Sequence, residues 1–311
     1  MPTVEAVPAP AETARSRRWY SHPLNRGAAY RLARAFAGAL PRTGRHMLAA
    51  ALGRMACRCL RAEREHVRWN LQRVVPQADP RRLDATVTRV FRNFGCIFAD
   101  LLTINRGPAE GLRHYLGGVR GEEHLAEAMA PARGVIVATA HLGNWELGGR
   151  LLVAARGRPT HVVLAAEEDP AVEAFLRRST PGMRFVTLRH PTTSLALLAA
   201  LRRNEIVAVQ GDRATGGPSD VRLPFFRAPS AFPVGPFRLA AASGAPVLPV
   251  FCVLAEDARY RIYLEAPIWV ERGGEVSGLE RLVTVLERYL ADFPDQWFAF
   301  YDVWESSREP A

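Results

Sequence analysis

The stretch at 134–149, GVIVATAHLGNWELGG, decides which fold class we expect for this chain. Its apolar, mostly β-branched residues at 135–139 follow a glycine, and such a run predicts a short buried strand. His141 comes where this strand should end, and Leu142-Gly143-Asn144 would form a turn. Asn144 is a suitable N-cap for a helix that begins at Trp145. The stretch therefore predicts the strand–turn–helix unit of an α/β protein.

The same corner could bring His141 close to Glu146. On one continuous helix their spacing would separate them by roughly 140°, whereas a turn between a strand and a helix lets them meet. An imidazole beside a carboxylate is the pair that a general base needs. A histidine at a strand end and a glutamate in a first helical turn are also ordinary structural features, because a carboxylate suits the helix dipole there. The spacing alone leaves both interpretations open.

An alternation of strands and helices surrounds this unit. Strands are expected at 134–140, 161–165, 184–188, 205–210, 246–254 and 259–265. Helices are expected at 28–40, 46–60, 85–102, 145–155, 170–178, 192–203, 234–243 and 278–291. The alternation predicts an α/β fold: a single domain with a mixed, mostly parallel sheet flanked by helices, plus an N-terminal helical extension. The last two strands are expected to form an antiparallel pair.

The positive charge is concentrated in the N-terminal third of the chain. Residues 1–92 contain 18 arginines and 6 acidic residues, and the chain has no lysine. We expect a disordered tail at 1–18, basic amphipathic membrane-associating helices at 19–60, a catalytic domain at 61–304 and a tail at 305–311. A localised basic region suggests an anionic partner such as a membrane surface. A helical hairpin packed on the domain, with a solvated arginine face, would explain the same pattern.

Several classes of protein do not fit the sequence. The N-terminus lacks a signal-peptide pattern, and no uncharged apolar run is long enough to predict a clear transmembrane helix. Cys57-Arg58-Cys59 has no second cysteine pair to complete a zinc site, whereas Cys96 and Cys252 lie in apolar runs and are expected in the core. We therefore expect no metal, no disulfide framework and a reducing compartment.

A second corner follows the strand expected at 205–210. Gly211-Asp212-Arg213 comes where that strand ends. Ligands of open α/β sheets bind at the carboxyl ends of the strands, so these residues should face the same crevice as His141. The planar guanidinium of Arg213 is suited to bind a phosphate or a carboxylate. A tight Gly-Asp turn with a surface arginine is the alternative.

Taken together, these motifs resemble those of a known superfamily. The HLGNWE sequence at 141–146 resembles the H-x4-(D/E) motif of the glycerophospholipid acyltransferases, in the form typical of the lipid A late acyltransferases (lauroyl/myristoyl acyltransferases). That branch includes phosphatidylinositol mannoside acyltransferases. GDRA at 211–214, the segment at 223–251 and PDQWF at 294–298 resemble later motifs of the same family. Their order and spacing agree from about residue 60 to 304.

The resemblance implies transfer of a fatty acyl chain from an acyl thioester to a lipid hydroxyl. The donor would be an acyl carrier protein or coenzyme A thioester, and the acceptor a lipid A precursor or a related glycolipid or phospholipid. His141 would be the general base, and Glu146 would orient its ring. The remaining motif residues would contact the substrate: Asn144, Gly211, Asp212 and Arg213. Backbone N–H groups near Gly143 or in the 211–214 turn are candidate oxyanion donors. No cofactor is implied.

Other functions fit parts of the sequence. Within the family, the acceptor could be a lysophospholipid or a phosphatidylinositol mannoside. A hydrolase could use His141 and Glu146, although no closely spaced metal-ligand motif is present. A basic lipid- or nucleic-acid-binding protein without catalysis would explain the charge, but no nucleic-acid-binding motif is found and we expect no nucleic acid partner. Because arginines interrupt the N-terminal apolar segments, peripheral or monotopic attachment to the cytoplasmic face of the bacterial inner membrane is expected.

Overall fold

A computed structural model describes residues 40–104, 109–164, 182–187 and 192–304 of the chain. The predicted tails at 1–18 and 305–311, the predicted helix at 170–178 and nearly all of the one at 28–40 lie outside these ranges. Helices occur in the order α2 (Arg42–Cys59), α3 (Arg61–Val74), α4 (Pro80–Ile104), α5 (Glu122–Met129), α6 (Trp145–Arg156), α8 (Thr192–Arg202), α9 (Gly235–Ser243) and α10 (Glu275–Asp292), with 3-10 turns η2 (Ala109–Tyr115) and η3 (Pro294–Gln296).

The strands are short and form one main sheet with a separate hairpin. They are β1 (Leu116–Arg120), β2 (Val135–Thr139), β3 (Thr160–Leu164), β4 (Met183–Thr187), β5 (Ile206–Gln210), β6 (Asp220–Phe225), β7 (Ala228–Pro233), β8 (Val247–Leu254) and β9 (Tyr260–Leu264). The main sheet has seven strands in the order β1-β9-β8-β2-β5-β3-β4. All its neighbours are parallel except β8 and β9. The predicted mixed, mostly parallel sheet and its antiparallel pair are confirmed.

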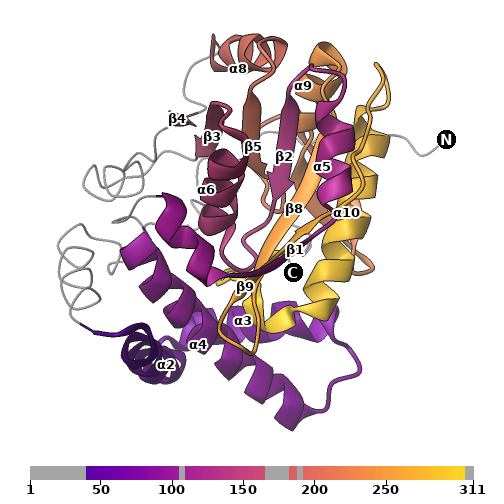
Figure 1. Ribbon diagram of the computed structural model, residues 1–311. Helices are drawn as coiled ribbons and strands as arrows, with labels where there is room; N and C mark the ends of the chain where they lie inside the picture. The colour runs from indigo at the N-terminus through magenta and orange to yellow at the C-terminus, as the bar shows by residue number, and fades with distance from the viewer. Residues whose placement is uncertain (1–39, 105–108, 165–181, 188–191, 305–311) are drawn as a thin grey trace.

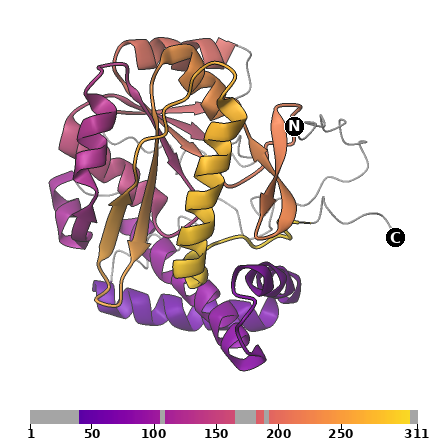
Figure 2. The same ribbon diagram turned by 90° about the vertical axis from the view of Figure 1, so that its right-hand side faces the viewer.

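Helices cover both faces of this sheet (Figures 1 and 2). Side chains of β2 alternate between two cores: Val135 and Val137 pack with residues of α4 and α5, whereas Ile136 and Ala138 pack with residues of α8, α9 and α10. A strand that is buried on both faces has a continuous apolar sequence. This is why residues 135–139 predicted a buried strand.

Helices α2, α3 and α4 lie together beyond one end of the sheet, toward which the β2 arrow points in Figure 1. Two glycines let α2 approach α4 closely. A Cβ on Gly53 would lie 2.5 Å from the Phe91 carbonyl oxygen, and one on Gly95 would lie 2.7 Å from the Ala49 carbonyl oxygen. Helix α2 is therefore packed closely on α4. No helix of the described residues is long and apolar enough to cross a membrane.

The structure adds elements that the sequence did not predict. Helix α4 begins at Pro80, five residues before the expected start at 85, and α2 spans 42–59 where 46–60 was expected. The elements α3, α5, β1 and the β6–β7 hairpin were not predicted. The hairpin contains Pro224, Pro229 and Pro233, and proline within a run argues against a strand. Both of its strands are edges, where a missing N–H is tolerated.

Candidate active site

The site lies at the carboxyl ends of the neighbouring strands β2 and β5. These strands are parallel and in register, with Thr139 opposite Gln210. His141 and Asp212 each follow two residues after these positions, and the Gly211 N–H donates to the Thr139 carbonyl oxygen at 2.8 Å. The register of the sheet therefore brings together two residues that are 71 positions apart in the sequence.

Asp212 binds His141 through both carboxylate oxygens. Its Oδ1 lies 2.8 Å from the ring Nδ1, and its Oδ2 accepts the His141 backbone N–H at 3.1 Å. The Asp212 side chain is only 2% exposed and the His141 side chain 12%. An ionised carboxylate can only accept hydrogen bonds, so Nδ1 carries the proton and Nε2 is the basic nitrogen.

The electrostatics of the pair favour a neutral ring beside an ionised carboxylate. Burial would raise the pKa of Asp212, but the His141 charge, the hydrogen bonds from His141 and the Arg213 charge outweigh it and lower that pKa to about 2. Burial and the Arg213 charge lower the pKa of His141 below its ordinary value, although Asp212 opposes them. His141 is therefore a free base at neutral pH.

The C-terminal segment holds Arg213 beside the pair. Its Nη2 donates to the Phe298 carbonyl oxygen at 3.0 Å, and its guanidinium carbon lies 5.2 Å from the centre of the Tyr301 ring. Its buried Nε has no hydrogen-bond partner in the described part of the chain. The contacts with Phe298 and Tyr301 fix the position of the Arg213 side chain.

Glu146 lies in the first turn of α6, as predicted, and its carboxylate Oε2 lies 3.8 Å from the Arg150 Nη2. Burial raises its pKa to about 7, against the effect of the Arg150 charge. The carboxylate that engages the His141 ring is Asp212, which the sequence had suggested as a substrate ligand. Nearness in the sequence favoured Glu146 as the partner of the His141 ring. The register of the sheet instead places Asp212 beside that ring. A catalytic role for Glu146 stays a prediction.

Asn144 caps α6 as predicted. Its Oδ1 accepts the Leu147 N–H at 3.1 Å, and its backbone N–H donates to the Cys252 carbonyl oxygen at 2.7 Å. The Gly143 N–H donates to the Gln296 carbonyl oxygen at 3.0 Å. With the Gly211 N–H also bound, neither glycine offers its own N–H to an oxyanion. At Gly143 the φ angle is 61°, and a Cβ would lie 2.1 Å from the Cys252 carbonyl oxygen, so only glycine fits.

Residues of the PDQWF segment brace this corner from the far end of the chain. The Phe298 N–H donates to the His141 carbonyl oxygen at 2.9 Å. The Gln296 side chain makes two hydrogen bonds with the Leu254 backbone, at 2.8 and 2.7 Å. The Trp145 ring meets the His141 ring edge-to-face, with centres 5.1 Å apart. The resemblance identified this segment, but its packing against the corner could not be predicted from spacing.

The described residues include no group of three or more His, Cys, Asp or Glu side chains placed to hold a metal ion. Cys57, Cys96 and Cys252 are buried free thiols. Burial raises the pKa of all three, most strongly for Cys252. These three thiols are therefore poor nucleophiles.

Comparison with known proteins gives a consistent result. The family model described as bacterial lipid A biosynthesis acyltransferase matches residues 28–306. A phosphatidylinositol mannoside acyltransferase of Mycobacterium tuberculosis H37Rv is 29% identical over 254 residues, which cover 77% of each chain. A lipid A biosynthesis palmitoleoyltransferase of Escherichia coli K12 is 24% identical over 248 residues, which cover 79% of this chain and 80% of the relative. These matches confirm the resemblance, and the chain therefore belongs to the bacterial lipid A biosynthesis acyltransferase family, whose members transfer acyl groups.

Proposed function

We propose that this protein moves a fatty acyl chain from an acyl thioester to a hydroxyl of a membrane glycolipid, with His141 as the general base. The thioester is carried by acyl carrier protein or coenzyme A. The observation that carries this proposal is the 2.8 Å contact between the His141 Nδ1 and the buried Asp212. It gives the ring one defined tautomer and makes Nε2 the proton acceptor.

In this mechanism the His141 Nε2 removes the proton from the acceptor hydroxyl as its oxygen attacks the thioester carbonyl. The tetrahedral intermediate then collapses, the carbon–sulfur bond breaks and the imidazolium returns its proton to the leaving thiolate. Asp212 holds the ring and stabilises the imidazolium while it is charged, as the third member of a catalytic triad does. General-base assistance of this kind contributes roughly 10²–10⁴ in rate.

Arg213 is the residue proposed to bind the anionic part of the substrate. It lies close enough to lower the pKa of His141, and its fork-shaped guanidinium suits a phosphate. Asn144 and Gly211 contribute by shaping the two turns. We keep Glu146 among the proposed site residues because it lies in the first turn of α6, beside the Asn144 cap.

Helix α2 supplies the surface proposed to lie on the membrane. In the described residues, five of the eight exposed large apolar side chains lie on α2 or directly before it: Leu40, Met47, Leu48, Leu52 and Met55. The helix carries four arginines and no acidic residue. An apolar outer face favours the membrane interpretation over a solvated arginine face. We place this helix on anionic lipid at the cytoplasmic face of the inner membrane, as a peripheral or monotopic contact.

Two acceptor classes follow from the relatives. The M. tuberculosis relative, named a phosphatidylinositol mannoside acyltransferase, shares a higher identity with this chain than the E. coli lipid A enzyme does. That difference favours a mannosylated phosphatidylinositol as a second candidate acceptor beside a lipid A precursor. Both are anionic glycolipids that offer a sugar hydroxyl beside a phosphate.

The test supplies the purified protein with fatty acyl thioesters of acyl carrier protein or coenzyme A and with either acceptor, and follows acylated lipid by mass spectrometry. His141→Ala should lower the rate at least a hundredfold. The matched control is His161→Ala, because His161 is also buried and also paired with a carboxylate, at 2.7 Å from Glu205. Transfer by His141→Ala at the wild-type rate would remove the general-base assignment. Release of free fatty acid without acylated lipid would indicate a hydrolase.

A further inference from the structure

Asn70 of α3 is a buried residue outside the group of site residues described above. It is 1% exposed, and its side-chain amide makes three hydrogen bonds with the chain segment at 299–303. Its Nδ2 donates to the carbonyl oxygens of Ala299 and Tyr301, at 3.0 and 2.8 Å. Its Oδ1 accepts the Val303 N–H at 3.2 Å. One side chain therefore satisfies three backbone groups of the C-terminal segment.

This segment needs a side chain as its partner because it has no regular structure. Residues 299–302 form neither helix nor strand, and Ala299 is buried. Buried backbone groups require hydrogen-bond partners, and where no neighbouring strand supplies them a side chain can. Loss of the amide would leave backbone groups of the segment unpaired, which is costly away from water. Asn70 therefore fixes the path of the chain between Ala299 and Val303.

The same segment holds Arg213 through two contacts. The Phe298 carbonyl oxygen accepts a hydrogen bond from the Arg213 Nη2 at 3.0 Å. The centre of the Tyr301 ring lies 5.2 Å from the guanidinium carbon. Asn70 binds the residue that directly follows Phe298 and binds Tyr301 itself. It therefore sets the spacing between the carbonyl oxygen and the ring that hold Arg213.

We propose that Asn70 is a positioning residue for Arg213, the side chain assigned to the anionic part of the substrate. Asn70 fixes the 299–303 segment, and the segment holds the guanidinium in place before the substrate arrives. An arginine that is already held loses less side-chain freedom on binding. This inference rests on the proposed function, because it assigns Asn70 an effect on substrate binding by Arg213. Asn70 is too deeply buried to touch the substrate itself.

The expected signature is a rise in one KM with little change in kcat. Arg213→Ala first identifies the substrate, acceptor or thioester, whose KM depends on the guanidinium. Asn70→Ala should raise that same KM about three- to tenfold, the cost of ordering a free arginine side chain. Its kcat should stay within about twofold of the wild type, because the contact between the His141 ring and Asp212 is left intact. An unchanged KM in Asn70→Ala would overturn the inference.

The matched control is Asn93→Ala. Asn93 of α4 is also buried, and its Nδ2 also donates to a carbonyl oxygen near the C-terminus, that of Asp295, at 3.0 Å. Asp295 precedes the residues that contact Arg213, so Asn93→Ala should keep the wild-type KM. Thermal unfolding compares the stabilities of the two variants. An equal rise of the KM in both would show a general loosening of the C-terminal segment and would also overturn the inference.

A double-mutant cycle tests whether Asn70 acts through Arg213. When Arg213 is already alanine, the further change Asn70→Ala should leave the KM unaltered. Multiplied increases would show that Asn70 acts elsewhere and would refute the link. If Asn70→Ala does not fold, Asn70→Asp takes its place, with the same rise in KM expected. It keeps the size of the side chain and the acceptor for the Val303 N–H but lacks the amide donors.

Chemical modification of Arg213 tests the inference independently of catalysis. Phenylglyoxal reacts with guanidinium groups, and mass spectrometry of peptides measures the rate at Arg213 alone. That rate should be several-fold higher in Asn70→Ala than in the wild type and in Asn93→Ala, because the guanidinium is no longer held. Equal rates in the three proteins would overturn the inference. If the wild type transfers no acyl chain, the proposed function fails, and this rate still decides whether Asn70 positions Arg213.

Discussion

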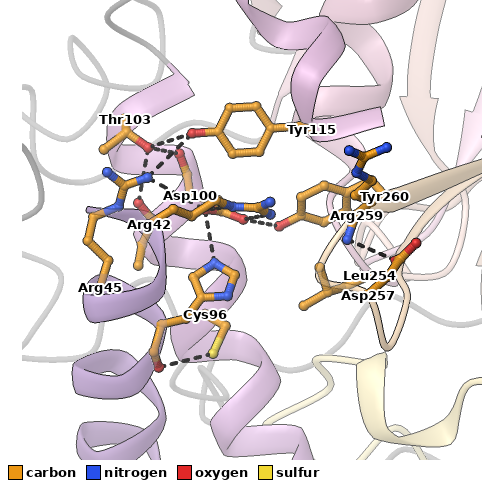
Figure 3. Close-up of polar contacts among 12 residues, drawn as sticks. Arg42, Arg45, Cys96, Asp100, Thr103, Tyr115, Leu254, Asp257, Arg259 and Tyr260 are labelled. Carbon is orange, nitrogen blue, oxygen red and sulfur yellow. Dashed lines mark hydrogen bonds and ion pairs between the residues drawn. The ribbon is translucent and has the colours of Figure 1, made fainter. Parts of the chain in front are cut away.

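Two buried aspartates, Asp212 and Asp100, have opposite surroundings, and the difference separates chemistry from architecture. Asp212 binds a single imidazole, whose second nitrogen remains able to accept a proton. Asp100 is bound by Arg42, His46 and Tyr260, which come from two other elements (Figure 3). An arginine does not release its proton in a protein. A carboxylate that also binds an arginine and a tyrosine stabilises a structure, whereas one whose side-chain partner is a histidine alone can support proton transfer.

The largest effect is expected when Asp212, the aspartate proposed to act in catalysis, is replaced. Asp212→Asn keeps the shape of the side chain but no longer stabilises an imidazolium. We expect kcat to fall roughly 10²–10⁴-fold, together with a loss of thermal stability, because the variant also loses the contribution of the lowered Asp212 pKa to folding. Steady-state kinetics of acyl transfer and a melting curve on the same preparation measure both. A loss of stability without a loss of kcat would assign Asp212 the architectural role.

The next largest effect, on the free energy of unfolding, is expected when Asp100 is replaced. Asp100→Ala leaves Arg42 and the Tyr260 hydroxyl without their common acceptor. Removing one partner of a buried ion pair costs about 3 kcal/mol, and denaturant titration measures the loss. Arg82→Ala is the control, because its ion pair with Asp79 is exposed and should contribute less than about 1 kcal/mol. Equal losses in the two variants would contradict the account of Asp100.

A smaller effect concerns stability in acid. The pKa of Asp212 falls from 3.8 to about 2 on folding, so its contribution is fully present above about pH 4 and is lost as the pH falls toward 2. The lowered pKa of His141 acts in the same direction, because the unfolded ring binds a proton more readily. Between about pH 4.5 and 7 the raised pKa of Glu146 acts in the opposite direction to that of His141. Unfolding free energy should therefore decrease on acidification below about pH 4 in the wild type. Asp212→Asn should lose less unfolding free energy than the wild type below pH 4, where Glu205 contributes in both proteins. Identical curves would refute the pairing.

The smallest effect concerns the surface of α2. Leu52 and Met55 are 51% and 55% exposed, and replacing both by glutamine should weaken binding to anionic liposomes about tenfold, given the free energy of burying apolar area. Leu195→Gln is the control, because Leu195 is 66% exposed but lies on α8. Flotation assays compare the three proteins. A similar loss for Leu195→Gln would mean that α2 is not the specific contact.

Local patterns predicted much of the fold and only part of the site. The runs that became β2 and β5 are apolar on both faces, and the stripe along α4 has clear helical spacing, so each was visible without tertiary information. Their carboxyl ends identified His141 and Asp212 as neighbours. The sequence suggested Glu146 as the partner of the His141 ring, but the ring contacts Asp212 instead. Nearness in the sequence does not show that β5 lies beside β2.

The Asp100 cluster could not be predicted at all. Its partners Arg42 and Tyr260 are 58 and 160 positions away, and none of the three lies in a recognisable motif. Asp100 itself reads as one polar residue at the end of an amphipathic helix. Only packing of α2 against α4 and the placement of β9 bring the group together, and neither follows from periodicity.

The central claim is that Asp212 tunes His141 as the base of an acyl transfer, and the pH dependence of kcat/KM tests it most directly. For the wild type we predict a rate that rises through one ionisation below the ordinary histidine pKa of 6.5 and is level above it. Because the Asp212 charge raises the pKa of His141, Asp212→Asn should be slower and should show that ionisation at a lower pH. If kcat/KM of Asp212→Asn fell on acidification at the same pH as that of the wild type, the claim would be contradicted.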